Sequence, residues 1–199
     1  MQPPKGSLDQ STANRTVALT IEPVTPEAAA DWFDFFDKRA FVDNPEWKGC
    51  YCTSPFLPKF EEYTNKSPRR KEYAQWLIEH QKMRGYLAYA GGKVVGWCNV
   101  NDRTALPKYA HISPAGEKVL SIACFLIQKE YRHTGIAQKI LERIVQDAQA
   151  EGVKIIEAYP KVNSHTESGN FRGPYSMYEK QGFIMEEING LKLARKYLG

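Results

Sequence analysis

The sequence predicts an α/β (α+β) fold, in which a single domain contains a mixed central sheet flanked by helices. Three observations lead to this expectation. Segments with the two-residue periodicity of strands alternate along the chain with segments of helical periodicity. A Gly-Gly pair between two strand-like segments predicts an antiparallel hairpin. A helical segment between two apolar strands predicts a parallel crossover, so both strand directions are expected in one sheet.

The N-terminal half is expected to run strand, helix, irregular segment and helix. Residues 17–21 alternate in polarity and predict the first strand. Residues 25–40 open with Thr-Pro-Glu, which combines a hydroxyl cap, a proline at the first helical position and an early carboxylate. Residues 43–58 are rich in aromatics and prolines and predict an irregular connection. A second helix is expected to begin at Ser67-Pro68 and to end at Gly85. One of its faces is expected to carry Tyr73, Trp76, Leu77 and His80.

The C-terminal half begins with the hairpin. Residues 86–89 and 94–100 are its expected strands, and Gly91-Gly92 between them tolerates the positive φ angles of a tight turn. A polar connection then leads to residues 119–128, whose nearly continuous apolar character predicts a central strand buried on both faces. The remaining elements are expected to be a helix at 136–148 closed by Gly152, a strand at 154–159, a short helix at 174–181, and strands at 183–187 and 191–198.

Composition indicates one globular domain. The chain has 199 residues, of which 42% are hydrophobic and 25% charged, and these are ordinary proportions for such a domain. We expect residues 1–16 to form a flexible polar tail and residues 17–199 to form the domain. A net charge of +4 without a long basic run argues against nucleic-acid binding, and no apolar stretch is long enough to span a membrane. The tail lacks the apolar core of a signal peptide, so we expect a cytoplasmic protein. Its expected oligomeric state is a monomer or a homodimer.

The four cysteines predict reduced thiols and no metal site. Cys98 and Cys124 lie in strand-like apolar runs, where a buried free thiol is the usual state. Cys50 and Cys52 form a C-x-C pair, which is too closely spaced for a structural zinc knuckle and has no histidine nearby. Because no secretory signal is apparent, all four are expected to be reduced.

The junction between the central strand and the long helix predicts an anion site. Residues 132–137 read Arg-His-Thr-Gly-Ile-Ala, so the helix does not start with a simple Ser or Asp cap. The first turn of a helix has unpaired N–H groups and a partial positive charge, which together favour a phosphate. Gly135 removes a Cβ from the approach, and Arg132 adds a charge. The alternative is a helix with an unusual cap and an incidental arginine. The Walker and dinucleotide-binding glycine patterns are absent.

Two motifs make the sequence similar to the GNAT superfamily of acyl-CoA-dependent N-acetyltransferases. The family's central motif is Arg or Gln, two residues, Gly, one residue, and Gly or Ala, which stands here at 132–137. Residues 177–183, Met-Tyr-Glu-Lys-Gln-Gly-Phe, resemble the family's C-terminal helix, which ends in Tyr-Glu-Lys-x-Gly-Phe. The resemblance covers residues 17–198 and is strongest over 119–183.

The resemblance implies that acetyl-CoA is bound as a co-substrate. In the family, the strand before the central motif splays from its neighbour and its free backbone groups bind the pantetheine arm, while the pyrophosphate lies on the motif. Carried over to this chain, the expected acetyl-CoA contacts are Phe125, Leu126, Ile127, Arg132, His133, Thr134, Gly135, Ile136 and Ala137.

The family's catalytic tyrosine corresponds to Tyr178, which is expected to act as the general acid by stabilising the departing CoA thiolate. The sequence departs from the family pattern before this residue, where an asparagine usually contacts the pantetheine from the same helix. Asn170 is the substitute that we consider, but Pro174 interrupts any continuous helix between the two residues.

No motif identifies the group that removes the proton from the amine. A lysine-like amine with a pKa of about 10.4 is mostly protonated at pH 7, so a general base or a water relay is expected. Glu157, on the strand after the central motif, is the base that we name first. The other candidates are Asp102, His111, Glu117, His165 and Glu167.

The predicted function is transfer of the acetyl group of acetyl-CoA to a primary amine of an unidentified acceptor, with a small molecule favoured. Residues 43–58 are expected to wall the acceptor pocket. Trp47, Tyr51 and Phe56 in this segment either line that pocket or fill the core beneath it. The alternative function is a non-catalytic CoA-binding module of GNAT-like fold that acts in regulation or interaction.

Overall fold

The computed structural model describes residues 18–57, 69–112, 118–161 and 170–199 of the chain. The expected tail at 1–16, the predicted start of the second helix at Ser67-Pro68, and the base candidates Glu117, His165 and Glu167 lie outside the described residues.

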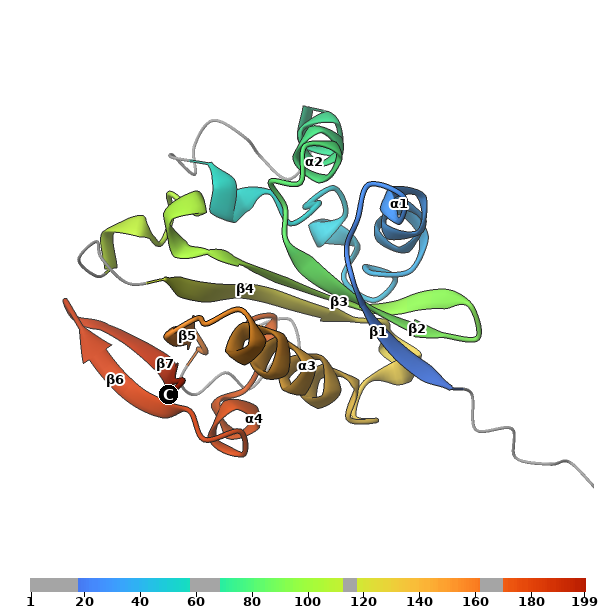
Figure 1. The fold of residues 1–199 in the computed structure, drawn as a ribbon. Helices are drawn as coiled ribbons and strands as arrows, with labels where there is room; N and C mark the ends of the chain where they lie inside the picture. Colours follow the sequence, from blue (N-terminus) through green and yellow to red (C-terminus); the bar gives the residue numbers. More distant parts are fainter. Residues whose placement is uncertain (1–17, 58–68, 113–117, 162–169) are drawn as a thin grey trace, which may run out of the picture.

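A mixed seven-stranded sheet forms the centre of the domain, as the sequence predicts (Figure 1). In spatial order its strands are β1 (Leu19–Pro23), β2 (Gly85–Ala90), β3 (Lys93–Asp102), β4 (Val119–Ile127), β5 (Ile155–Ala158), β7 (Leu191–Tyr197) and β6 (Ile184–Ile188). Neighbouring strands are antiparallel except for β4 and β5, which are parallel. Because α3 (Ile136–Ala150) joins these two strands, the predicted crossover is confirmed.

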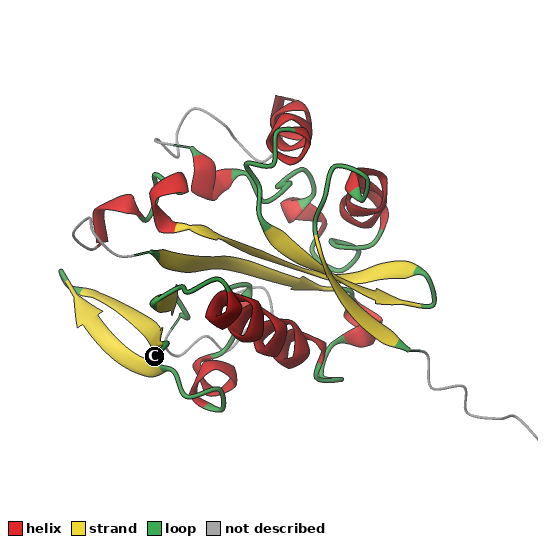
Figure 2. Cartoon of the chain, in the orientation of Figure 1, coloured by secondary structure: helices red, strands yellow, loops and turns green. Residues whose placement is uncertain are grey.

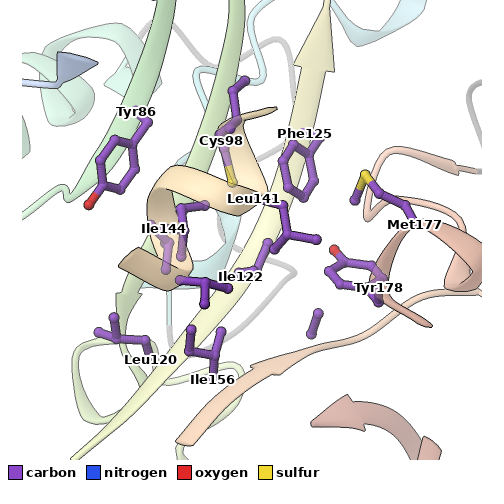
Figure 3. Packing of buried hydrophobic residues seen from close by; sticks show 14 of the residues in the cluster. Tyr86, Cys98, Leu120, Ile122, Phe125, Leu141, Ile144, Ile156, Met177 and Tyr178 are labelled. Carbon is purple, nitrogen blue, oxygen red and sulfur yellow. The ribbon is translucent and has the colours of Figure 1, made fainter. Parts of the chain in front are cut away.

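Helices cover both faces of the sheet (Figure 2). The helices α1 (Ala29–Lys38) and α2 (Arg69–Glu79) lie over one face, and α3 and the short α4 (Tyr175–Glu179) lie over the other. Each face has its own buried core. The core under α3 is mainly aliphatic and includes Ile122 and Leu141 (Figure 3). The core under α1 is rich in aromatic rings, with Trp32 stacked on Phe36 and edge-on to Trp97.

The predicted hairpin is confirmed. β2 and β3 are joined by Gly91 and Gly92, whose φ angles of 57° and 72° are both in the left-handed region. The first strand lies later in the chain than predicted, since β1 extends to Pro23. A proline without an N–H is tolerated there because β1 is an edge strand and Pro23 is its last residue.

The predicted start of the first helix is wrong by one turn. α1 begins at Ala29 rather than at Pro26, because the preceding residues form a hydrogen-bonded turn in which the Ala28 N–H donates to the Thr25 carbonyl over 3.1 Å. The threonine and proline therefore build the entry to the helix and not its first turn.

The predicted end of the second helix is also wrong. α2 ends at Glu79, and Gly85 is the first residue of β2. A Cβ on Gly85 would overlap the Trp97 side chain of the neighbouring strand, so packing requires this glycine. The face predicted for α2 is divided. Leu77 is buried in the core and Tyr73 packs against the edge of that core, whereas Trp76 and His80 are exposed. The ring of Trp76 stacks on those of Tyr73 and His80.

The central strand pair is splayed, as predicted. The parallel ladder joins residues 119–122 of β4 to residues 155–158 of β5. Residues 123–127 of β4 continue beyond β5 and pair only with β3 on their other side. The edge of β4 is therefore open at the end that leads into the turn before α3.

Gly96 of β3 lets the start of α3 lie close against the sheet. A Cβ at this position would lie 2.8 Å from Cδ1 of Ile127 and 3.3 Å from Cγ2 of Ile136. Ile127 is the last residue of β4 and Ile136 is the first of α3. A glycine thus sets how closely these two elements approach each other.

Candidate functional site

A cavity of about 330 Å³ lies beside the splayed end of β4. It is bounded by the segment after α1, the open edge of β4, the turn before α3 and the residues that lead into α4. Its wall includes Phe41, Trp47, Phe125, Leu126, Ile127, Arg132, His133, Gly135, Ile136, Ala137, Asn170, Phe171, Gly173 and Met177. Every residue predicted to contact acetyl-CoA lies in this wall except Thr134. The fold therefore brings both parts of the predicted contact set, and Asn170, to a single cavity.

Two left-handed residues shape the turn before α3. His133 has a φ of 61° and Gly135 a φ of 85°, and α3 begins directly afterwards without a side-chain cap. The Thr134 hydroxyl donates instead to the Tyr131 carbonyl over 2.6 Å. Because no side chain caps the helix, its first-turn N–H groups can bind an anion. A Cβ on Gly135 would have no protein atom within 4 Å, so the space beside it is open.

Arg132 connects this turn to the segment that follows α1. Its guanidinium donates through both terminal nitrogens to the carboxylate of Asp43, and its Nε donates to the Ile127 carbonyl over 3.1 Å. Both partners of the ion pair are mostly buried, with side chains 17% and 18% exposed. The hydrogen bond from Arg132 lowers the pKa of Asp43, so this carboxylate stays charged. Asp43 was not among the predicted site residues, because nothing in the sequence connects two residues so far apart.

The open edge of β4 is already hydrogen-bonded at one point. The Phe125 N–H, which the resemblance assigns to the cofactor, donates to the carbonyl of Phe171 over 2.6 Å. The Phe171 ring packs against Trp47 with ring centroids 5.4 Å apart, and so bridges the cavity wall to the segment after α1. Phe171 was not predicted, and its neighbour Asn170 was the nearest residue singled out from the sequence.

Tyr178 is fully buried in the core under α3, where it lies close to Met177 (Figure 3). Its ring lies between those of Phe125 and Phe183, with centroids 6.4 and 5.3 Å away. Its hydroxyl donates to the carbonyl of Arg172, and burial raises the pKa of Tyr178 well above its usual value. Gly173 lines the cavity and lies next to this hydroxyl, since a Cβ there would be 3.0 Å from the hydroxyl oxygen. The tyrosine is therefore a neutral hydrogen-bond donor next to the cavity wall.

Glu157 lies outside the cavity wall, in a buried polar cluster on β5. One carboxylate oxygen accepts hydrogen bonds from Ser121 (2.9 Å) and Tyr159 (2.6 Å). The other accepts from Arg195 at 3.0 Å and from Arg103 at 3.5 Å. The side chain is 0% exposed, and its charge is balanced by two arginines. The hydroxyls of Ser121 and Tyr159 are the groups through which a proton could reach it.

The other described base candidates lie away from the cavity wall. Asp102 accepts hydrogen bonds from the N–H and the hydroxyl of Thr104, so it caps a short 3-10 helix at 103–105. His111 belongs to a second 3-10 helix at 110–112 and is exposed.

The aromatic residues between α1 and α2 divide into two groups. Trp47 lines the cavity. Tyr51 stacks on Phe36 and donates its hydroxyl to Asp37 of α1, and Phe56 is buried in the core under α1. Of the three rings considered for an acceptor pocket, one therefore borders the cavity and two support α1.

Cys50, Cys52 and Cys124 lie on the α1 side of the sheet, whereas Cys98 is buried in the core under α3, and none of the four borders the cavity. The Sγ atoms of Cys52 and Cys124 lie 2.7 Å apart, and all four cysteines are free thiols. Within the described ranges, no group of three or more His, Cys, Asp or Glu side chains is arranged to hold a metal ion. No helix in the same ranges is long and apolar enough to cross a membrane.

Comparisons with known proteins identify the family and the fold. Residues 45–183 match the family model for the acetyltransferase (GNAT) family. No curated protein matches the chain.

Several solved structures share the fold at low sequence identity. The GNAT domain of PAT from S. lividans is 17% identical, with 89% of each chain covered and a TM-score of 0.56. The yncA protein from Salmonella typhimurium, solved with its cofactor acetyl-CoA, is 12% identical, with 92% of this chain and 95% of that chain covered and a TM-score of 0.55. The paia N-acetyltransferase from Thermoplasma acidophilum, in complex with coenzyme A, is 14% identical, with 90% and 99% covered and a TM-score of 0.50.

Proposed function

Because the chain belongs to the acetyltransferase (GNAT) family, we propose that it transfers the acetyl group of acetyl-CoA to a primary amine of a small-molecule acceptor. One observation carries this proposal. An uncapped helix start and the part of β4 that extends beyond β5, which suit the two ends of acetyl-CoA, border the same cavity.

The anionic end of acetyl-CoA would bind at the turn before α3. The helix start supplies N–H groups and a partial positive charge, and Gly135 leaves room for the phosphates. The apolar wall from Phe125 to Ile127 would hold the pantetheine arm, and Asn170 would contact it from the other side. Solved structures of the same fold carry acetyl-CoA or coenzyme A, which supports this assignment.

The transfer would proceed by direct attack of the amine on the thioester carbon. A C–N bond forms, the C–S bond breaks, and negative charge develops on the departing sulfur. Tyr178 would stabilise this charge by donating a hydrogen bond. Its buried hydroxyl has a raised pKa, whereas a free thiol ionises at about 8.5, so the proton is expected to stay on the phenol oxygen in the transition state.

The proton released by the amine requires an acceptor, and we retain Glu157 for this role. Because both of its oxygens already accept hydrogen bonds, the proton would reach Glu157 through a hydroxyl that contacts it. Tyr159 and Ser121 supply such hydroxyls, and they also contact each other at 2.9 Å. A Glu157→Gln variant that folds as wild type and retains its turnover rate and pH profile would remove this residue from the mechanism.

A panel of amines tests the proposed activity. Purified protein is incubated with acetyl-CoA and each amine, and the release of free CoA thiol is measured. Binding of CoA is measured in parallel by calorimetry. Amine-dependent thiol release supports the transferase. Binding of CoA without thiol release from any amine would favour the non-catalytic module, for which the existing hydrogen bonds of Phe125 and Tyr178 are the specific observation.

A further inference from the structure

Two consecutive carbonyl groups occupy the two hydrogen-bond donors that the proposed transfer would use. The Phe171 carbonyl accepts from the Phe125 N–H over 2.6 Å, and the Arg172 carbonyl accepts from the Tyr178 hydroxyl. These donors lie on different elements, β4 and α4, and meet at one short segment, residues 170–173, which we call the strap.

The occupied donors conflict with the chemistry proposed for this site. Each donor has a single proton, and a second acceptor can be bound strongly only when the first one leaves. A thioester oxygen at Phe125 would require the Phe171 carbonyl to move, and a thiolate at Tyr178 would require the Arg172 carbonyl to move. Both displacements concern the same strap.

We propose that the strap is an internal occupant of the thioester site, which acetyl-CoA must displace before transfer can occur. This inference depends on the proposed function, because it assumes that the thioester lies between Phe125 and Tyr178. In the described conformation, two peptide oxygens of the chain stand where the carbonyl oxygen and the sulfur of the substrate would lie. The strap is therefore an autoinhibitory contact, and binding of the pantetheine arm releases it.

The strap is built so that it can exchange with a ligand. It is a tight turn in which the Gly173 N–H donates to the Asn170 carbonyl over 2.7 Å, and Gly173 has a φ of 79°. The ring of Phe171 rests on Trp47, which also lines the cavity. Asn170, Phe171 and Gly173 are all part of the cavity wall, so a ligand in the cavity contacts the strap directly.

Displacement leaves both donors with an acceptor, whereas the carbonyl groups of Phe171 and Arg172 lose the donors that they have in the closed form. The Phe125 N–H and the Tyr178 hydroxyl keep an acceptor in both states, first from the strap and then from the substrate. Releasing the strap also costs free energy. The apparent affinity for CoA is therefore lower than the intrinsic affinity, in proportion to the fraction of molecules in which the strap is released. A ligand without the pantetheine arm does not bear this cost.

Two ligands distinguish these states in the wild-type protein. CoA carries the pantetheine arm, whereas adenosine 3′-phosphate 5′-diphosphate is the part of CoA that lacks it. Backbone amide shifts and hydrogen exchange are measured for Phe125, Phe171, Arg172 and Gly173 with each ligand. CoA is expected to change all four residues, and the shorter nucleotide is expected to leave them as in the free protein. A structure of the CoA complex is expected to have Phe171 O more than about 3.5 Å from Phe125 N, beyond hydrogen-bonding distance.

The two proposals fail differently. If amine-dependent thiol release occurs but CoA leaves the Phe125–Phe171 hydrogen bond intact, the strap is a fixed wall and this inference is wrong while the transferase stands. If neither CoA binding nor thiol release is found, the proposed function is wrong and the strap has no substrate to exclude.

A glycine variant tests the strap by weakening its closed form. A Cβ at Gly173 would lie 2.7 Å from the Met177 Cε and 3.0 Å from the Tyr178 hydroxyl, so Gly173→Ala disfavours the described conformation. Gly190→Ala is the control, because Gly190 has a similar φ of 77° but a Cβ there would have no protein atom within 4 Å. Gly173→Ala is expected to bind CoA about 3- to 10-fold more tightly than the control, because a smaller fraction of its molecules has the strap in the closed form. Its affinity for the shorter nucleotide should not change. Weaker CoA binding by a folded Gly173→Ala protein would overturn the inference, and if this variant does not fold, the two-ligand comparison in wild type decides.

Discussion

The two ends of the cavity differ in whether their hydrogen-bonding groups are already in use. At the turn before α3, the helix start has no side-chain cap and the space beside Gly135 is open. At the edge of β4, the Phe125 N–H and the Tyr178 hydroxyl are both bonded to the strap. In the proposed function the first end receives the phosphates without rearrangement, whereas the second releases the strap when the pantetheine arm binds. Binding affinity is therefore expected to depend mainly on the turn, and turnover mainly on the strand edge.

The largest expected effect is on turnover, at the strand edge. Tyr178→Phe keeps the ring between Phe125 and Phe183 and removes the hydroxyl that is proposed to stabilise the thiolate. We expect the turnover rate to fall by about 10- to 1000-fold, because the lost interaction strengthens in the transition state. The KM for acetyl-CoA should change little, and the free energy of unfolding should fall by less than about 1.5 kcal/mol.

Tyr175→Phe is the matched control for this variant. Tyr175 lies on the same helix and packs against the same core, but it does not border the strand edge. Steady-state kinetics with an accepted amine compare the two variants. An unchanged turnover rate in Tyr178→Phe, with chemistry shown to limit the rate, would leave the tyrosine as a packing residue only.

The next effect is on affinity, at the turn. Gly135→Val places a branched side chain in the space that the phosphates would occupy, at a φ of 85°. Gly152→Val imposes similar backbone strain at the other end of α3, where φ is 67° and the surroundings are equally open. Both variants should lose about 1–3 kcal/mol of stability. Only Gly135→Val should bind CoA more weakly, by about 10- to 100-fold, since the helix start is the proposed phosphate site.

Calorimetry with CoA and thermal unfolding are the measurements for this pair. Equal CoA affinities in two folded variants would show that the turn is not the phosphate site. The strap would then be the feature to examine for binding as well as for turnover.

A smaller effect is expected from the carboxylate beside the turn. Asp43→Asn removes the negative charge paired with Arg132 and leaves the guanidinium next to the proposed phosphate site. CoA is expected to bind about 2- to 5-fold more tightly at low salt, and less so as salt screens the charge. Asp34→Asn, which breaks the ion pairs of this α1 carboxylate with Lys38 and Arg39, should leave the affinity unchanged. Weaker binding by Asp43→Asn would mean that the ion pair instead holds the turn in its binding shape.

The smallest expected effect concerns the thiols. Cys52 and Cys124 contact each other in the core under α1, whereas Tyr178 belongs to the core under α3, on the other face of the sheet. Chelators and reductants should therefore leave the melting temperature and the turnover rate unchanged. Stoichiometric zinc in the purified protein, or a melting temperature that drops in reductant, would contradict this expectation.

The sequence was sufficient to predict those parts of the fold that depend on a few neighbouring residues. The Gly91-Gly92 turn, the crossover helix and the turn at 132–137 are each specified by a few neighbouring residues, and all three are present. Gly85 was assigned wrongly for the opposite reason, because its role depends on a contact with another strand. A glycine after a helix normally reads as its end, but here its role is to avoid the Trp97 side chain on another strand.

The remaining parts of the candidate site depend on contacts between distant residues. Asp43 reaches Arg132 only after the sheet and α1 have packed together. The carbonyls of the strap have no side-chain signature at all, because backbone oxygens are present at every position. The buried surroundings of Glu157 likewise bring together residues from three strands and a 3-10 helix. Periodicity and motifs contain no information on such pairs.

Gly96 of β3 lies beside both the end of β4 and the start of α3, the two elements that border the proposed acetyl-CoA site. Ile127, which ends the strand edge, and Ile136, which starts the helix, both touch the space above this one residue. The distance between the proposed phosphate site and the proposed thioester site thus depends on β3, a strand that contributes to neither site. If acetyl-CoA is held by its phosphates, this distance determines which of its atoms lies at the strand edge. An alanine at position 96 would bring its Cβ within 2.8 Å of Ile127 Cδ1 and 3.3 Å of Ile136 Cγ2, so the side chains at the end of β4 and at the start of α3 would have to adjust.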